Sequence, residues 1–173
     1  MTRAGTALLA AAAALAACQP QAGGAPVPDG LRFALERTAC HGTCPVYRVE
    51  VDSDGTVTWE GKRFVKVQGP ATATIPRDSV AALYAEFERA QFAAMPDSLT
   101  FGSPACPQVI ADLPSAIVTF ARTGMVKVVR HDQGCGGAPD ALRRLEERLD
   151  AVAGTARWIG TDAERTAADG PVR

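Results

Sequence analysis

Hydrophobic and polar residues alternate along the first part of the chain, as in strands that bury one face. Leu31, Phe33 and Leu35, for example, are separated by Arg32 and Ala34. A turn sequence, Asp-Ser-Asp-Gly at 52–55, lies between two of the stretches and is typical of a hairpin. The pattern therefore predicts four short strands in succession, which comprise residues 31–36, 47–51, 57–59 and 63–67.

The second part of the chain contains two helical patterns with a pair of strands between them. Pro76 suits the first turn of one helix, and the other begins at Pro139 and is closed by Gly154. Residues 116–122 and 125–131 alternate as strands joined by a short turn. The apolar stripes of the helices are Val80, Leu83, Phe87 and Ala90 in the first, and Leu142, Leu145, Leu149 and Val152 in the second.

Grouped strands with helices that do not alternate regularly with them indicate an α+β fold. We expect an antiparallel sheet of about six strands, in the order β-β-β-β-α-β-β-α, with two helices packed on one face. Trp158 and Ile159 are expected to pack back on the sheet. The expected core comprises Phe33, Leu35, Tyr47, Val49, Val51, Val57, Trp59, Val118, Phe120 and Val128 on the strands, and Leu83, Phe87, Leu145 and Leu149 on the helices.

Composition and charge restrict the function more than they define it. The chain has 173 residues, 47% hydrophobic and 21% charged, as is ordinary for one globular domain. The formal net charge is −1 and no basic stripe is visible, so we expect no binding to nucleic acid. We assign residues 31–160 to a single domain and expect the polar tail at 161–173 to be disordered.

The N-terminus has the features of a bacterial export signal. Arg3 precedes an apolar Ala/Leu run, which is shorter than the roughly 20 residues that a membrane-spanning helix needs. The run ends in Leu-Ala-Ala-Cys at 15–18, which resembles the lipobox of lipoproteins. This resemblance implies that residues 1–17 are removed as a signal peptide and that Cys18 is the lipid attachment site. Residues 18–30, rich in Gln, Pro and Gly, are expected to form a flexible tether.

The lipobox resemblance implies that the protein is located in the cell envelope and is anchored in a membrane by its N-terminal lipid. The residue after Cys18 is Gln19, and not the Asp that resembles an inner-membrane retention signal. We therefore favour the periplasmic side of the outer membrane.

Four further cysteines, Cys40, Cys44, Cys106 and Cys135, are expected to form two disulfides in this oxidising compartment. Three pairings are possible. We favour Cys40–Cys44, because Gly42 lets the chain bend between them, together with Cys106–Cys135. The latter disulfide would hold in place a long segment at 93–114, which contains four prolines and shows no period.

Three other interpretations of the cysteines remain open. Cys40, His41, Cys44, His131 and Cys135 are all potential metal ligands, but only one tight ligand pair is present. A thiol-redox site would favour a CxxC motif at a helix N-terminus, whereas these residues form CxxxC before a strand. A nucleophilic Cys–His pair lacks a visible orienting partner.

Three motifs resemble the bacterial domain-of-unknown-function family 6438. They are Cys-His-Gly-Thr-Cys-Pro-Val-Tyr at 40–47, Asp-Gly-Thr-Val-Thr-Trp-Glu-Gly at 54–61, and Pro-x-x-Leu-x-x-Leu-Glu at 139–146. The resemblance covers residues 33–159 and implies a small exported module, often found on lipoproteins, for which no catalytic residue can be transferred.

The sequence thus favours a disulfide-stapled binding or structural module over an enzyme. We assign no catalytic residue, cofactor or metal, and expect the partner to be an envelope protein or a cell-wall component. The alternative is an envelope thiol-redox or metal-dependent enzyme that uses Cys40, His41 and Cys44.

Overall fold

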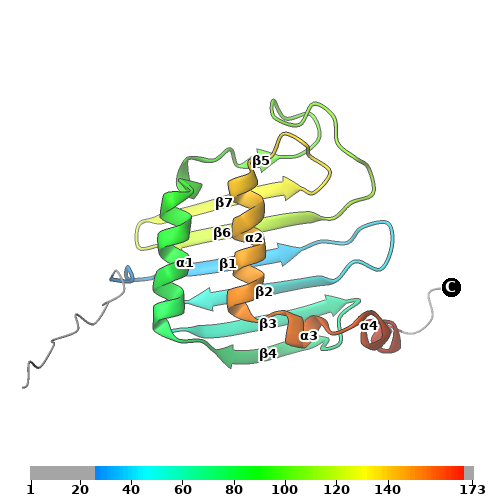
Figure 1. Ribbon diagram of the computed structural model, residues 1–173, viewed down its shortest axis with the longest axis horizontal. Helices are drawn as coiled ribbons and strands as arrows, with labels where there is room; N and C mark the ends of the chain where they lie inside the picture. Colours follow the sequence, from blue (N-terminus) through cyan, green and yellow to red (C-terminus); the bar gives the residue numbers. More distant parts are fainter. Residues whose placement is uncertain (1–25, 170–173) are drawn as a thin grey trace, which may run out of the picture.

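The computed structural model describes residues 26–169, in which a seven-stranded sheet forms one layer (Figure 1). The strand order is β4-β3-β2-β1-β6-β7-β5. All neighbouring strands are antiparallel except β5, which is parallel to β7. The strands are β1 (Arg32–Arg37), β2 (Val46–Asp52), β3 (Thr56–Arg63), β4 (Gly69–Thr74), β5 (Ser98–Leu99), β6 (Ser115–Arg122) and β7 (Met125–Asp132).

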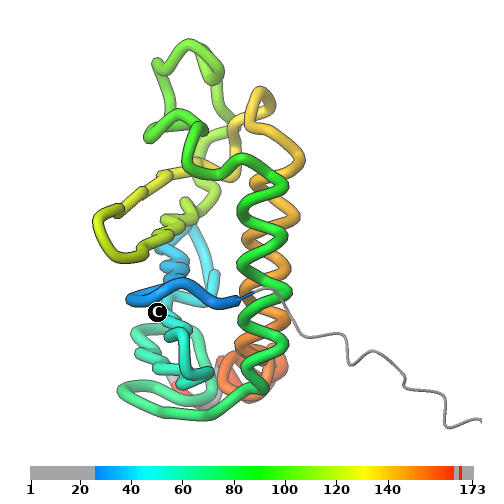
Figure 2. The backbone as a smooth tube through the Cα atoms, turned by 90° about the vertical axis from the view of Figure 1, so that its left-hand side faces the viewer, coloured from blue at the N-terminus to red at the C-terminus, as the bar shows by residue number. Residues whose placement is uncertain are grey.

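Two long helices, α1 (Arg77–Arg89) and α2 (Asp140–Ala153), form the second layer. They lie side by side and run across the strands (Figure 1), and both are on the same side of the sheet (Figure 2). The predicted α+β fold with two helices on one face is therefore confirmed. The shorter helices are η1 (Phe92–Ala94), α3 (Ala156–Ile159) and α4 (Asp162–Asp169).

The core lies between the two layers and is rich in aromatic side chains. Phe33 and Phe87 contact each other with ring centroids 4.7 Å apart, and Trp59 stacks between Tyr47 and Trp158. All the residues that we expected in the core are buried, with one exception described next. Alternation thus identified the buried face of β1, β2, β3 and β6 correctly.

The exception is Val128, whose side chain is 42% exposed. Val128 pairs with Thr119 on the face of the sheet opposite the helices, whereas Val129 and His131 are buried on the helical side. The prediction for Val128 is wrong because valines occupy both faces of this strand, at 126 and 128 on one and at 129 on the other.

The prediction of a fourth strand at 63–67 is also wrong. Strand β3 ends at Arg63, and Phe64 adopts a left-handed conformation (φ 51°) that turns the chain. The N–H groups of Lys66 and Val67 then donate to the carbonyls of Ile159 and Trp158 in α3. These donors are satisfied without a strand partner, and the fourth strand is β4, slightly later in the chain.

The sheet also has a seventh strand, so it is mixed rather than wholly antiparallel as we expected. Strand β5 consists of two residues, and it pairs with Arg130 and His131 of β7. It lies in the proline-rich connection that follows α1, where the chain returns along the sheet edge (Figure 1). Two residues are too few to produce an alternating pattern.

Helix α4 replaces the disorder that we expected at the start of the polar tail. Thr161 and Glu164 form a capping box, in which Thr161 N donates to Glu164 Oε2 at 2.9 Å and Glu164 N donates to Thr161 Oγ1 at 3.4 Å. Lys66 Nζ lies 2.6 Å from Glu164 Oε1. This hydrogen bond from Lys66, with those from Thr161, lowers the pKa of Glu164 to about 2. The helix has local polar stabilisation that an apolar period does not reveal.

The predicted signal peptide at 1–17, Cys18 and most of the tether lie outside the described residues. Within residues 26–169, no helix is long and apolar enough to cross a membrane.

Candidate functional site

Three loops meet at one end of the sheet, which we call the loop end: residues 38–45, 100–114 and 133–139 (Figure 1). They follow or precede β1, β6 and β7, which are neighbours in the sheet. His41 N donates to the Asp112 carbonyl at 3.1 Å, and Ile110 N donates to the Gly134 carbonyl at 3.0 Å. These backbone bonds join the three loops into one surface.

Both disulfides are in the loop end, and they have the connectivity that we favoured. Cys40 and Cys44 lie with sulfurs 1.94 Å apart, and Cys106 and Cys135 with sulfurs 1.92 Å apart. The second pair is buried in the core, whereas the first is half-buried at the surface. The second disulfide therefore anchors the long loop at 100–114 to the body of the domain.

Glycines let the long loop approach the chain around Cys135 closely. A Cβ atom on Gly134 would lie 2.1 Å from the Ile110 carbonyl oxygen, and one on Gly137 would lie 2.0 Å from the Ala105 carbonyl oxygen. Any side chain at these two positions would push the loop away. The glycines of the Gly-Cys-Gly-Gly sequence at 134–137 thus allow the loop backbone to pack directly against this segment.

We expect the two disulfides to contribute unequally to stability. Their sequence separations are 29 and 4 residues. On the chain-entropy model, replacing Cys106 and Cys135 by alanine lowers the free energy of unfolding by roughly 3.6 kcal/mol, and replacing Cys40 and Cys44 lowers it by roughly 2 kcal/mol. Urea denaturation of both double variants without reductant measures this difference. An equal or reversed ranking would contradict the role of the long loop.

The structure separates the residues of the metal and redox alternatives. Cys40 and Cys44 are paired with each other, His41 is exposed beside them, and His131 is buried under α2. No group of three potential ligands comes together anywhere in residues 26–169. The Cys40–Cys44 disulfide leads into strand β2 and does not begin a helix, unlike the CxxC sites at helix N-termini that favour a reactive thiolate.

The long loop exposes three large apolar side chains. Phe101 is 71% exposed, Ile110 is 69% exposed and Leu113 is 44% exposed. Single exposed apolar residues are common on surfaces, but here three belong to one loop of 15 residues that a buried disulfide holds. Because the disulfide restrains the loop, its apolar side chains can contact a partner with a small loss of conformational entropy.

Beneath the loop end lies a buried polar network that sequence analysis missed. His131 Nδ1 and Glu146 Oε1 are hydrogen-bonded at 2.7 Å, and Gln133 Nε2 donates to Glu146 Oε2 at 2.8 Å. The side chains of His131 and Glu146 are at most 2% exposed. Both groups lie on the core side, between β7 and α2.

The network continues through Arg37 to Asp150. Arg37 Nη2 lies 2.9 Å from Asp150 Oδ2, and Tyr47 Oη donates to Asp150 Oδ1 at 2.6 Å. Burial lowers the pKa of Arg37, but Asp150, Tyr47 and Glu146 together outweigh this effect, so the pKa is raised overall. Burial raises the pKa of Tyr47, and Asp150 raises it further. These groups therefore stay as guanidinium and neutral phenol throughout the physiological pH range.

A cavity of about 320 Å³ opens beside this part of the network. Its walls combine Arg37, Tyr47 and Asp150 with apolar residues and with Cys44 of the surface disulfide. The network thus supports the wall of a small cavity at the loop end, but its strongest acceptors are already occupied by protein donors. We interpret it as a structural support for the loop end.

A signal for the network was present in the sequence. Arg37 continues the alternation of Phe33 and Leu35, and Glu146 lies on the apolar stripe of α2, one residue after Leu145. A charged residue in phase with a core face is a recognisable sign of a buried polar partner.

The fold and this end of the sheet define a small α+β module whose loops are held by two disulfides. The model of the family described as Domain of unknown function (DUF6438) matches residues 31–153. The chain belongs to this family, as its motifs indicated. No curated protein matches the chain significantly.

Proposed function

We propose that the protein is a lipid-anchored module of the cell envelope that binds a partner protein through its loop end and has no catalytic activity. The observation that carries this proposal is the exposure of Phe101, Ile110 and Leu113 on a loop fixed by the Cys106–Cys135 disulfide. Apolar side chains held in one arrangement favour a specific protein contact, since little conformational entropy is lost on binding.

The path of the chain supports this arrangement. Residues 26–31 enter β1 at the end of the sheet opposite the loop end (Figure 1), where Thr123 N donates to the Asp29 carbonyl at 3.0 Å. A lipid on Cys18 would therefore tether the domain from the far end. An anchor at this end would leave the loop end accessible to a partner in the periplasm or the cell wall.

Site-specific photo-crosslinking in intact cells tests the binding surface. We expect a photoreactive residue at Ile110 or Leu113 to give one discrete adduct with an envelope protein. The same residue at Ala82, which is exposed on α1, is the control and should give no adduct of that size. Equal labelling from Ala82, or no adduct from the loop, would contradict the proposal.

The lipid anchor is tested separately by the Cys18→Ser variant. Because the thioether forms on the cysteine sulfur, we expect this variant to lose fatty-acid labelling and to accumulate as an uncleaved or soluble form. Metabolic labelling with a clickable fatty acid measures the loss. Normal labelling of Cys18→Ser would contradict the anchor but leave the loop-end contact to be judged by its crosslinks.

A further inference from the structure

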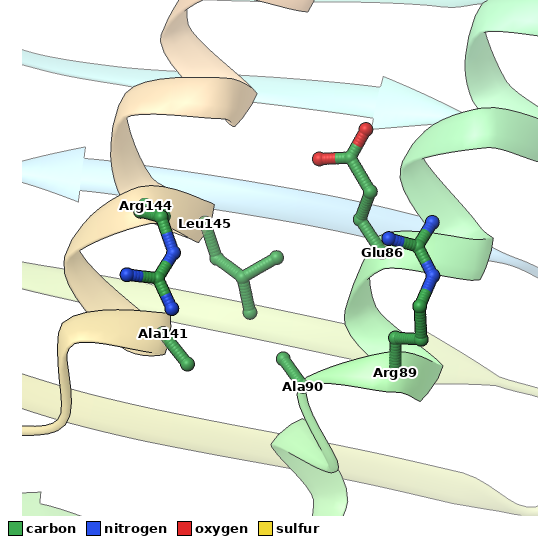
Figure 3. Close-up of a pocket in the computed structure, with 6 residues that line it drawn as sticks. All are labelled: Glu86, Arg89, Ala90, Ala141, Arg144 and Leu145. Carbon is green, nitrogen blue, oxygen red and sulfur yellow. The ribbon is translucent and has the colours of Figure 1, made fainter.

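A hollow lies on the outer surface of the helical layer, near the start of α2 and the end of α1. It opens between α1 and α2, has a volume of about 400 Å³, and is shown in Figure 3. Ala90 and Ala141 face each other across it with small side chains, and Leu145 contributes to its floor. Its remaining walls are polar and charged, from Glu86, Arg89 and Arg144.

The charges around the hollow do not cancel. Glu86 is already engaged, because Arg148 Nε donates to its carboxylate at 3.0 Å. Arg143 is engaged with Asp140 and with the carbonyls of Ala138 and Cys135.

Arg89 and Arg144 remain, one on each helix. In the described part of the chain, neither guanidinium has an ion pair or a hydrogen bond, although every other arginine of α2 does. Figure 3 shows their guanidinium groups flanking the hollow from opposite sides. The hollow is therefore lined by two uncompensated positive charges over an apolar floor.

This combination selects a particular ligand chemistry. Guanidinium groups bind oxyanions through paired, charge-assisted N–H···O bonds. A phosphate monoester carries a charge of about −1.5 to −2 at neutral pH, which matches two guanidinium groups better than a single carboxylate does. The alanines and Leu145 leave room for, and contact with, the apolar part of such a ligand.

We propose that the hollow between α1 and α2 is a binding site for a phosphate monoester group, held between Arg89 and Arg144. The ligand is either a small soluble phosphate or the headgroup of a membrane lipid. Both have the same anionic group, and the test distinguishes them. None of the residues that line this site belongs to the partner surface of Phe101, Ile110 and Leu113.

The test is an NMR titration of the purified full chain, in the form that cells accumulate, kept in a neutral detergent. Two probes are used: glycerol 3-phosphate, and detergent micelles containing phosphatidic acid. We expect saturable shifts of the amide signals of Ala90, Ala141 and Leu145. Saturation with glycerol 3-phosphate supports a soluble ligand, and saturation with phosphatidic acid alone supports a lipid headgroup.

The Arg89→Gln/Arg144→Gln variant should weaken binding at least about tenfold, because both charge-assisted contacts are removed. The matched control is Arg77→Gln/Arg130→Gln, which removes the same charge from exposed positions outside the hollow and should change affinity less than about twofold. The absence of saturable shifts with both probes, or an equal loss in the control, would overturn the proposal.

Discussion

Replacing Phe87 by alanine is expected to lower the free energy of unfolding by about 3–5 kcal/mol. Phe87 is fully buried on α1, and its ring lies 4.7 Å from that of Phe33, 5.0 Å from that of Phe92 and 5.4 Å from that of Phe120. Removal of the ring opens a cavity between the helical layer and the sheet, and close-packed neighbours refill such a cavity only partly.

The matched control for this substitution is Phe101→Ala in the long loop. Phe101 is 71% exposed, so the same change should alter the free energy of unfolding by less than about 0.5 kcal/mol. Urea denaturation followed by tryptophan fluorescence measures both variants, since Trp59 and Trp158 stack in the core. A similar effect at the two positions would mean that α1 does not pack on the sheet as described.

The core faces could be predicted because each long strand has only one apolar face. In β1, β2, β3 and β6 the buried positions alternate with polar or small ones, so the register follows from the sequence. In β7 the valines at 126, 128 and 129 occupy both faces, and only the pairing with β6 decides which is buried.

The other differences arise where long-range contacts replace local preference. The segment after Arg63 consists of residues that suit a strand, but α3, almost a hundred residues later, takes its backbone donors. Strand β5 exists because the proline-rich connection passes the edge of β7. Neither contact leaves a periodic pattern, so neither could be predicted from sequence alone.

At the loop end, chemistry of the cysteines was more informative than periodicity. The expected oxidising compartment and the even number of cysteines predicted two disulfides. The flexible Gly42 indicated that Cys40 and Cys44 form the disulfide with the shorter sequence separation. The exposed loop residues were not predicted, because an apolar residue in an aperiodic segment can be either buried or exposed. The hollow of Figure 3 was missed as well, since the arginines of α2 read as an ordinary mixed-charge helix face.

Replacing Asp150 by alanine should destabilise the protein about as much as the loss of Phe87, by about 3–5 kcal/mol, for an electrostatic reason. Asp150 accepts hydrogen bonds from Arg37, Tyr47 and Thr155, and the side chains of Arg37 and Asp150 are only 18% and 20% exposed. The variant leaves the Arg37 guanidinium largely buried with only Glu146, at 3.4 Å, to compensate it.

Two further variants show whether the buried charge is the cause. Asp140→Ala removes a carboxylate from the same helix, but that carboxylate is 82% exposed beside Arg143, so the cost should be about 1 kcal/mol or less. Arg37→Met combined with Asp150→Ala should be more stable than Asp150→Ala alone, because the uncompensated charge is then absent. Urea denaturation of the complete double-mutant cycle measures this coupling. If the double variant is instead less stable by the sum of the two single effects, Arg37 and Asp150 act independently, and the network does not support the loop end through their ion pair.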